Sequence, residues 1–211
     1  MGQDRSERRV VQPGWGTARL RGRDGTVKIR NSRTGKEIQT FSAHAGTVVS
    51  VAFHPDGEHV ASVGADRKVK VWNLTATGQP VFDGPCDAIR KFGTAYTVAF
   101  SPDGRKLAAG SDGDVRVWEW MNRQLLHTLA GHRIHSVPVA FSRDGRRLAT
   151  AGAFQVGPML WDLEAGGQPL RTASDPNRAD DPEYIVRLVG QVVRVSVETV
   201  RIVKELPAAF A

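Results

Sequence analysis

The chain contains very little cysteine and no long run of apolar residues. Cys86 is the single cysteine among 211 residues, so no internal disulfide can form and a reducing, cytoplasmic compartment is expected. No stretch approaches the roughly 18 uninterrupted apolar residues of a membrane-spanning helix. The arginines near the start are not followed by an apolar run, so neither export nor membrane insertion is expected.

Motifs typical of common enzymes are also missing. The sequence has no Gly-x-Ser-x-Gly, no glycine-rich loop before a lysine and no His-Glu-x-x-His. Three of its six histidines, His127, His132 and His135, lie close together, but without nearby cysteines or paired carboxylates they are a weak indication of a metal site. We therefore expect no enzymatic activity, no metal and no cofactor.

Basic residues outnumber acidic ones, yet they are not gathered in one place. The formal net charge is +7, which favours acidic partners. The arginines are scattered through expected turns and strand ends, and no block of about five or more like charges occurs. A nucleic-acid or other polyanion-binding module is therefore kept as an alternative function, although a dedicated nucleic-acid site is not expected.

One stretch of sequence is written three times. The three copies are "VSVAFHPDGEHVASVGADRKVKVWN" from Val49, "YTVAFSPDGRKLAAGSDGDVRVWEW" from Tyr96 and "VPVAFSRDGRRLATAGAFQVGPMLWDL" from Val137. Apolar residues alternate in each copy, which predicts strands with one buried face. The Pro-Asp-Gly or Arg-Asp-Gly between the first two strands predicts a tight turn. Each copy is therefore predicted to build four antiparallel strands.

Repeats of this length, with Gly-His near the start and Trp-Asp at the end, resemble the WD-repeat family of β-propellers. The resemblance covers roughly residues 22–170 and is strongest to bacterial WD-repeat arrays. It implies an all-β fold of about three to four four-stranded blades, arranged as an open arc because propellers typically have four to eight blades. It also implies a non-catalytic scaffold for protein–protein interaction.

The resemblance further implies a hydrogen-bonded set of His, Ser or Thr, Asp and Trp in each blade. The matching positions are His44, Ser62, Asp66, Trp72, Asp112, Trp118, His132, Thr150 and Trp161. Only the first of the three copies, from Val49, has the complete set. The second copy lacks Gly-His, and the third has Gln155 where Asp is expected. On the face that carries the Asp turns, the basic residues expected to suit an acidic protein partner are Arg67, Lys68, Arg90, Lys91 and Arg133.

The N-terminal region looks like an incomplete repeat. The stretch "GWGTARLRGRDGTVKIRN" resembles the second and third strands of a blade, with Arg30 at the position of Trp72. Because a buried arginine would be costly, Arg30 is expected at an exposed edge. Residues 1–21 are interpreted as an N-terminal segment with the remnant of a blade, and residues 22–171 as the WD-repeat blades.

The C-terminal region leaves the repeat altogether. Residues 172–182 have the composition of a linker, and residues 183–211 form an amphipathic segment. Arg187, Arg194 and Arg201 recur every seven residues, which favours an amphipathic helix ending at Leu206. The alternating valines after Gly190 leave a strand open as the alternative. The apolar face of this segment would pack on the open end of the arc or on a second chain, so self-association is a further expectation.

Overall fold

Every regular element in the described part of the chain is a β-strand. The computed structural model describes residues 9–12, 16–20, 24–31, 33–76, 78–86, 97–111, 114–131, 139–150, 159–172, 192–196 and 199–203. These residues form four four-stranded antiparallel sheets and one two-stranded hairpin. Among them there is no helix long and apolar enough to cross a membrane.

The four sheets follow one another along the chain, and each is a simple up-and-down meander. The first contains β1 (Arg9–Gln12), β2 (Gly16–Leu20), β3 (Thr26–Arg30) and β4 (Glu37–Ser42). The second contains β5 (Val48–Phe53), β6 (His59–Gly64), β7 (Lys68–Asn73) and β8 (Phe82–Pro85). The third contains β9 (Thr97–Phe100), β10 (Lys106–Gly110), β11 (Asp114–Glu119) and β12 (Gln124–Ala130). The fourth contains β13 (Val139–Phe141), β14 (Arg147–Thr150), β15 (Met159–Asp162) and β16 (Gln168–Thr172).

The turn between the first two strands is built alike in the second, third and fourth sheets. Gly57, Gly104 and Gly145 have φ values of 79°, 75° and 68°, a conformation that glycine adopts without strain. In each turn an Asp side chain accepts a backbone N–H two residues further on, as Asp103 Oδ1 does from the Arg105 amide at 3.1 Å. The hairpins are thus encoded locally, as the sequence predicts.

Side-chain alternation places the core between neighbouring sheets. On β6, Val60 packs toward the first sheet and Ala61 toward the third, because successive residues of a strand face opposite sides. Trp72, Trp118 and Trp161 each pack toward the preceding sheet and are at most 4% exposed. Each sheet therefore shares a hydrophobic layer with the next.

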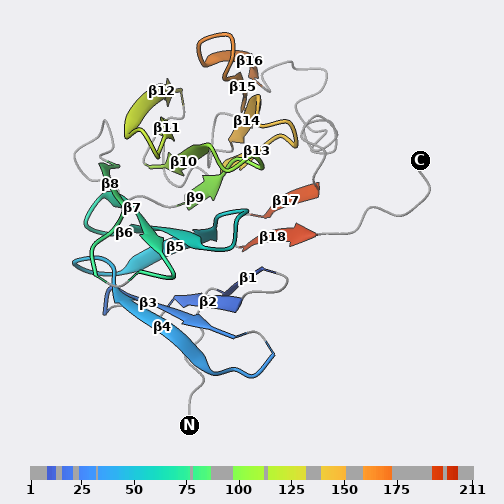
Figure 1. Ribbon diagram of the computed structural model, residues 1–211. Coiled ribbons are helices and arrows are strands. Elements are labelled where there is room, and N and C mark those ends of the chain that lie inside the picture. Colours follow the sequence, from blue (N-terminus) through green and yellow to red (C-terminus); the bar gives the residue numbers. More distant parts are fainter. Residues whose placement is uncertain are drawn as a thin grey trace.

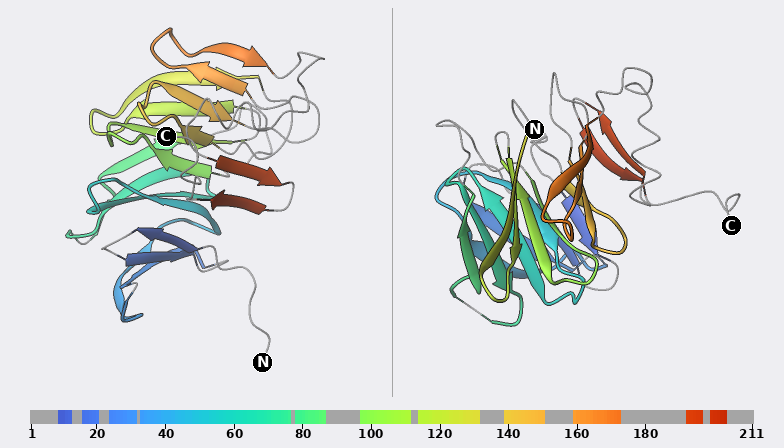
Figure 2. Two further views of the ribbon diagram at one scale, coloured as in Figure 1. Left: turned by 90° about the vertical axis from the view of Figure 1, so that its right-hand side faces the viewer. Right: turned by 90° about the horizontal axis from the view of Figure 1, so that it is seen from above.

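The sheets form an open stack in chain order, from β1–β4 to β13–β16 (Figure 1). The inner strand β5 contacts β1 on one side and β9 on the other, and β9 contacts β13. The strands do not close into a barrel, and the two views of Figure 2 show the resulting arc. This arrangement confirms the expected all-β fold of a partial propeller.

The first sheet is more complete than the sequence suggests. β1 and β2 supply its first two strands, so the sheet begins at Arg9 and is not half a blade. The expectation that Arg30 lies at an edge is wrong, since β3 pairs with both β2 and β4. The Arg30 side chain is 37% exposed and lies 3.7 Å from the Glu37 carboxylate. The partial exposure and this carboxylate make the charge tolerable there.

The helix predicted for the C-terminal segment is wrong for the part that the structure describes. β17 (Val192–Ser196) and β18 (Thr199–Val203) form an antiparallel hairpin in which Arg194 is paired with Arg201. The alternative of a strand after Gly190 is confirmed, in keeping with the preference of valine for extended backbone. Residues 173–182 of the expected linker and residues 183–191, 197–198 and 204–211 of the C-terminal segment lie outside the described residues.

Candidate interaction face and the network beneath it

A chain of hydrogen bonds links four side chains inside the second sheet. Trp72 Nε1 donates to Ser62 Oγ at 3.0 Å, and Ser62 Oγ lies 2.9 Å from His44 Nε2. His44 Nδ1 lies 2.8 Å from Asp66 Oδ1. The Asp66 carboxylate can only accept, so the proton of the neutral imidazole lies on Nδ1 and is donated to Asp66, and Nε2 accepts from the Ser62 hydroxyl. The structure thus brings His44, Ser62, Asp66 and Trp72 into one relay.

The relay is shielded from water at its centre. Ser62 is fully buried and the His44 side chain is 0% exposed. Burial lowers the pKa of His44, with a smaller contribution from Lys70, whereas Asp66 works in the opposite direction. The imidazole is therefore held neutral with its proton on Nδ1.

A glycine makes room for the relay. A Cβ on Gly64 would lie 2.4 Å from His44 Cγ, so any larger residue would push the imidazole out of place. The sequence comparison of the repeats passed over Gly64, although glycine at the end of a strand signals such a close approach.

The Ser–His–Asp order of the relay resembles that of a hydrolase triad, but the arrangement cannot carry out that chemistry. A nucleophilic serine has to reach a substrate carbonyl. Ser62 is fully buried, and its oxygen already accepts the Trp72 N–H. The relay can hold the blade together, and it offers no attacking group to a substrate.

The other two repeats contain only parts of the set among the described residues. Trp161 Nε1 donates to Thr150 Oγ1 at 2.8 Å, and both residues are buried. Trp118 is buried in the layer between the second and third sheets. Asp112 and His132 lie outside the described residues.

Asp114 is a buried acid that the sequence analysis did not single out. Its side chain is fully buried at the start of β11 and accepts the Ser111 hydroxyl at 2.5 Å. Burial raises the pKa of Asp114, and the bond from Ser111 and the charge of Arg116 oppose that effect. Asp114 could have been found from the aligned repeats, because it takes the position that Lys68 has in the second sheet.

The turn after β6 carries the first part of the candidate interaction face. Asp66 Oδ1 accepts the Lys68 N–H at 3.2 Å, and Asp66 Oδ2 accepts the Ala45 N–H at 3.3 Å. Arg67 sits in the left-handed region with φ 61°, and its carbonyl accepts the Cys86 N–H at 2.8 Å. The relay and these bonds hold the turn in one conformation.

Arg67 and Lys68 are both exposed on this turn. Together with Asp66, Asp83 and Pro85 they line a shallow hollow. Lys68 Nζ lies 3.1 Å from Asp83 Oδ2, so part of its charge is balanced within the sheet. Arg90, Lys91 and Arg133, the other expected members of the face, lie outside the described residues.

Comparison with known proteins places this geometry in a family. Residues 35–73 and 83–119 match the WD40 family, described as "WD domain, G-beta repeat". The chain belongs to the WD-repeat family. It is 34% identical to human apoptotic protease-activating factor 1 over 141 residues, and 30% identical to rat transducin beta-like protein 3 over 147 residues.

These WD-repeat relatives are much longer than the chain. The matched part covers 62% of the chain and 11% of apoptotic protease-activating factor 1, and 68% of the chain and 16% of transducin beta-like protein 3. Among solved structures, the computationally designed Ika8 protein superimposes with a TM-score of 0.63 at 27% identity, over 78% of the chain and 47% of that protein. The chain therefore spans about half of that structure.

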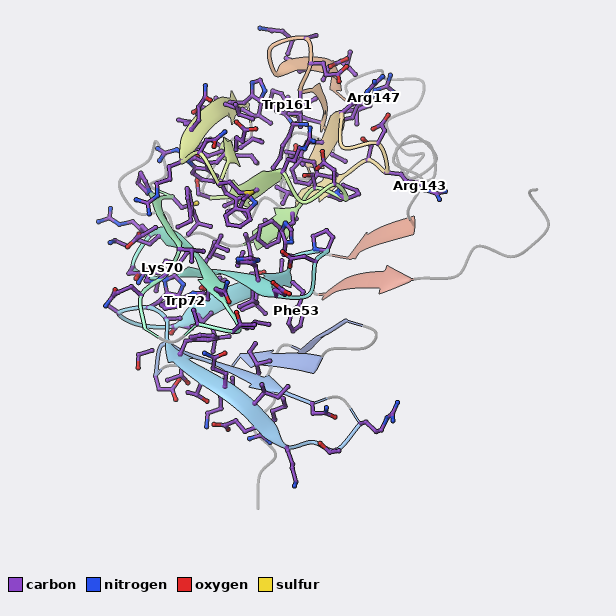
Figure 3. The ribbon with its side chains drawn as sticks, viewed as in Figure 1. Phe53, Lys70, Trp72, Arg143, Arg147 and Trp161 are labelled. Carbon is purple, nitrogen blue, oxygen red and sulfur yellow. The ribbon has the colours of Figure 1, made fainter. Side chains whose placement is uncertain are left out.

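Two basic side chains tie neighbouring WD blades together. Lys70 Nζ donates to the Ala43 carbonyl at 2.6 Å and lies 5.7 Å from the Trp72 ring centroid. Figure 3 labels Lys70 and Trp72. At the equivalent position of the third sheet, Arg116 donates to the Pro85 carbonyl at 2.9 Å. Sequence reasoning did not identify these contacts, although a basic residue two positions before the Trp in both repeats was a usable signal.

Proposed function

We propose that the chain is a non-catalytic scaffold for protein–protein interaction that acts in the cytoplasm and holds a partner with acidic side chains. The observation that carries the proposal is the exposed Arg67–Lys68 turn, fixed from beneath by the buried relay. Rigid presentation favours binding because less conformational freedom is lost when the partner docks. The match to WD repeats supports the class of scaffold, and an uncharacterized WD repeat-containing relative from Synechocystis supports the bacterial type of array.

The charge at this turn favours an acidic partner. Asp66 directs both carboxylate oxygens inward, to His44 and to two backbone N–H groups. Its negative charge is therefore directed into the blade, and the outer surface of the turn carries Arg67 and Lys68, with Asp83 lying 3.1 Å from the Lys68 ammonium. Arginine is also among the residues enriched at protein interfaces.

Charge reversal tests the proposal. Arg67→Glu with Lys68→Glu should remove acidic partners from the set of proteins that the immobilised chain captures. The matched control is Arg33→Glu with Lys36→Glu, two exposed charges in the turn between β3 and β4. That turn lies at the opposite end of the blades from the Arg67 turn, since successive turns of a meander alternate between ends. Equal capture by both variants would reject this face.

The same variants decide the alternative of polyanion binding, which rests on the net charge of +7. Retention of a labelled DNA or RNA oligonucleotide is measured between about 50 and 200 mM salt. A non-specific polyanion binder loses affinity steeply over this range, and both charge reversals weaken it alike. Loss of protein capture in the Arg67–Lys68 variant alone favours the scaffold.

Self-association is proposed as a second property of the scaffold. The four sheets form an arc that is not closed, and the chain covers 47% of the designed protein that it resembles. A second copy would be of the right size to supply the remaining blades. Light scattering of the isolated chain should give twice the 23.0 kDa mass of one chain, and a monomer at all concentrations would reject a ring of two copies.

A further inference from the structure

The turn between β5 and β6 differs in chemistry from its two counterparts in the chain. Its sequence from residue 54 is "HPDGEH", whereas the corresponding turns from residues 101 and 142 are "SPDGRK" and "SRDGRR". In those two turns a serine donates to the Asp carboxylate, as Ser101 does to Asp103 and Ser142 does to Asp144, each at 2.5 Å. In the turn between β5 and β6, His54 takes the place of the serine, and His59 takes the place of Lys106 and Arg147.

The two histidines converge on one carboxylate. His54 Nδ1 lies 2.8 Å from Asp56 Oδ1, and His59 Nδ1 lies 2.8 Å from Asp56 Oδ2. One ligand atom from each of the three residues lies within 4.8 Å of the others.

Neighbouring groups orient the imidazoles. His54 Nε2 donates to the Gly104 carbonyl at 2.9 Å, which leaves the Nδ1 lone pair of the neutral ring directed at Asp56. A backbone carbonyl on the far nitrogen is the usual support of a metal-binding histidine. The ring of His54 also packs edge-on against Phe100 at 4.8 Å and Trp120 at 5.5 Å between centroids. These contacts fix its direction.

We propose that this turn binds a divalent first-row transition-metal ion through His54 Nδ1, the Asp56 carboxylate and His59 Nδ1. Two imidazoles and one carboxylate are a donor set that suits zinc and its neighbours, with one position open to water. The side chains of His54, Asp56 and His59 are 12%, 37% and 18% exposed, so an ion can reach them.

Binding requires local adjustments. Ligand atoms around a tetrahedral zinc at about 2.0–2.2 Å lie roughly 3.3 Å apart, so the two 2.8 Å pairs have to open by about half an ångström. The ligand atoms of the two histidines, which lie within 4.8 Å of each other, have to take up the same separation. The bond from the Asp56 amide to His54 Nδ1, now 3.1 Å, is given up to the ion. His59 has to carry its proton on Nε2 so that Nδ1 can bind the ion. The side-chain Nδ2 of Asn73, now 3.4 Å from that Nε2, then has to move away because both nitrogens carry protons.

Zinc titration of the full chain by calorimetry tests the site. The key variant is His54→Ser with His59→Lys, which writes into this turn the residues that the chain itself uses at 101 and 106. His127→Gln removes an imidazole elsewhere and serves as the matched control. We expect one zinc per chain. The double variant should raise the dissociation constant at least about 100-fold, which is more than the loss of an outer-shell partner costs. The control should bind zinc as the unaltered chain does.

Two results would overturn the site. One is zinc binding of equal affinity in the double variant, and the other is no saturation of the unaltered chain below about 1 mM. His59→Lys alone keeps the bond from His54 to Gly104 and decides the matter if the double variant fails to fold. It should weaken zinc binding by about tenfold or more, and wild-type affinity in this variant would also contradict the proposal.

Discussion

Ser62→Ala removes one oxygen that two buried side chains share. The Trp72 N–H donates to it at 3.0 Å and His44 Nε2 lies 2.9 Å from it, in a position that is fully buried. After the substitution both nitrogens face apolar surroundings. Each buried polar group that loses its partner costs about 1–3 kcal/mol, so the free energy of unfolding should fall by about 2–6 kcal/mol. That is a large share of the roughly 5–15 kcal/mol of a typical domain.

A double-mutant cycle separates the relay from simple loss of packing. Trp72→Phe removes the indole N–H and keeps an aromatic ring against Phe41, whose centroid now lies 5.1 Å away. In that background Ser62→Ala leaves only His44 without a hydrogen-bond partner. The free energy of unfolding that it removes should therefore be smaller by about 1–2 kcal/mol. Urea unfolding followed by circular dichroism and by fluorescence gives all four free energies.

The control for this cycle is Ser50→Ala, at a partly exposed position on β5 of the same sheet. It should change stability by no more than about 0.5 kcal/mol. Ser62 does not join Trp72 to His44 energetically if Ser62→Ala is as mild as this control, or if the effects of Ser62→Ala and Trp72→Phe simply add.

Two further predictions concern the same relay. Burial lowers the pKa of His44 below its unfolded value of about 6.5, so the folded chain binds fewer protons than the unfolded chain. The stability that His44 contributes is therefore complete above about pH 6.5. It is lost as the pH falls through the pKa of His44 in the folded chain. Denaturant midpoints from pH 7.5 to 5 should therefore fall less steeply for His44→Gln, and parallel curves would contradict the effect. Gly64→Ala places a methyl 2.4 Å from His44 Cγ and should lower the free energy of unfolding by about 1–3 kcal/mol. The control is Gly35→Ala, where φ is 69° and no atom lies within 4 Å of the added methyl. It should show the cost of backbone strain alone, about 1 kcal/mol. Equal losses would mean that the imidazole yields freely.

The sequence predicts the blades well because their signals are local. Val69 and Val71 alternate with charged residues on β7, and glycine with positive φ closes the turn at Gly57 and its counterparts. A strand face and a tight turn each depend on a few neighbouring residues. The fold class therefore follows from the chain alone.

Features set by distant neighbours were missed. His54 reaches Gly104 and Lys70 reaches Ala43, each in an adjacent sheet, and no pattern within one repeat names these acceptors. The segment after Gly190 satisfies both a seven-residue and a two-residue period, so periodicity alone could not separate helix from strand there. Arg30 was misplaced because its strand β3 pairs on both sides, with β2 and with β4.

We propose that the turn of Arg67 and Lys68 holds an acidic protein partner. Its most direct test is the affinity of one captured partner for three chains: unaltered, Arg67→Glu with Lys68→Glu, and Arg33→Glu with Lys36→Glu. We expect only Arg67→Glu with Lys68→Glu to weaken binding, by about tenfold or more at low salt, with most of that difference disappearing at high salt. Equal affinities for all three chains would contradict it.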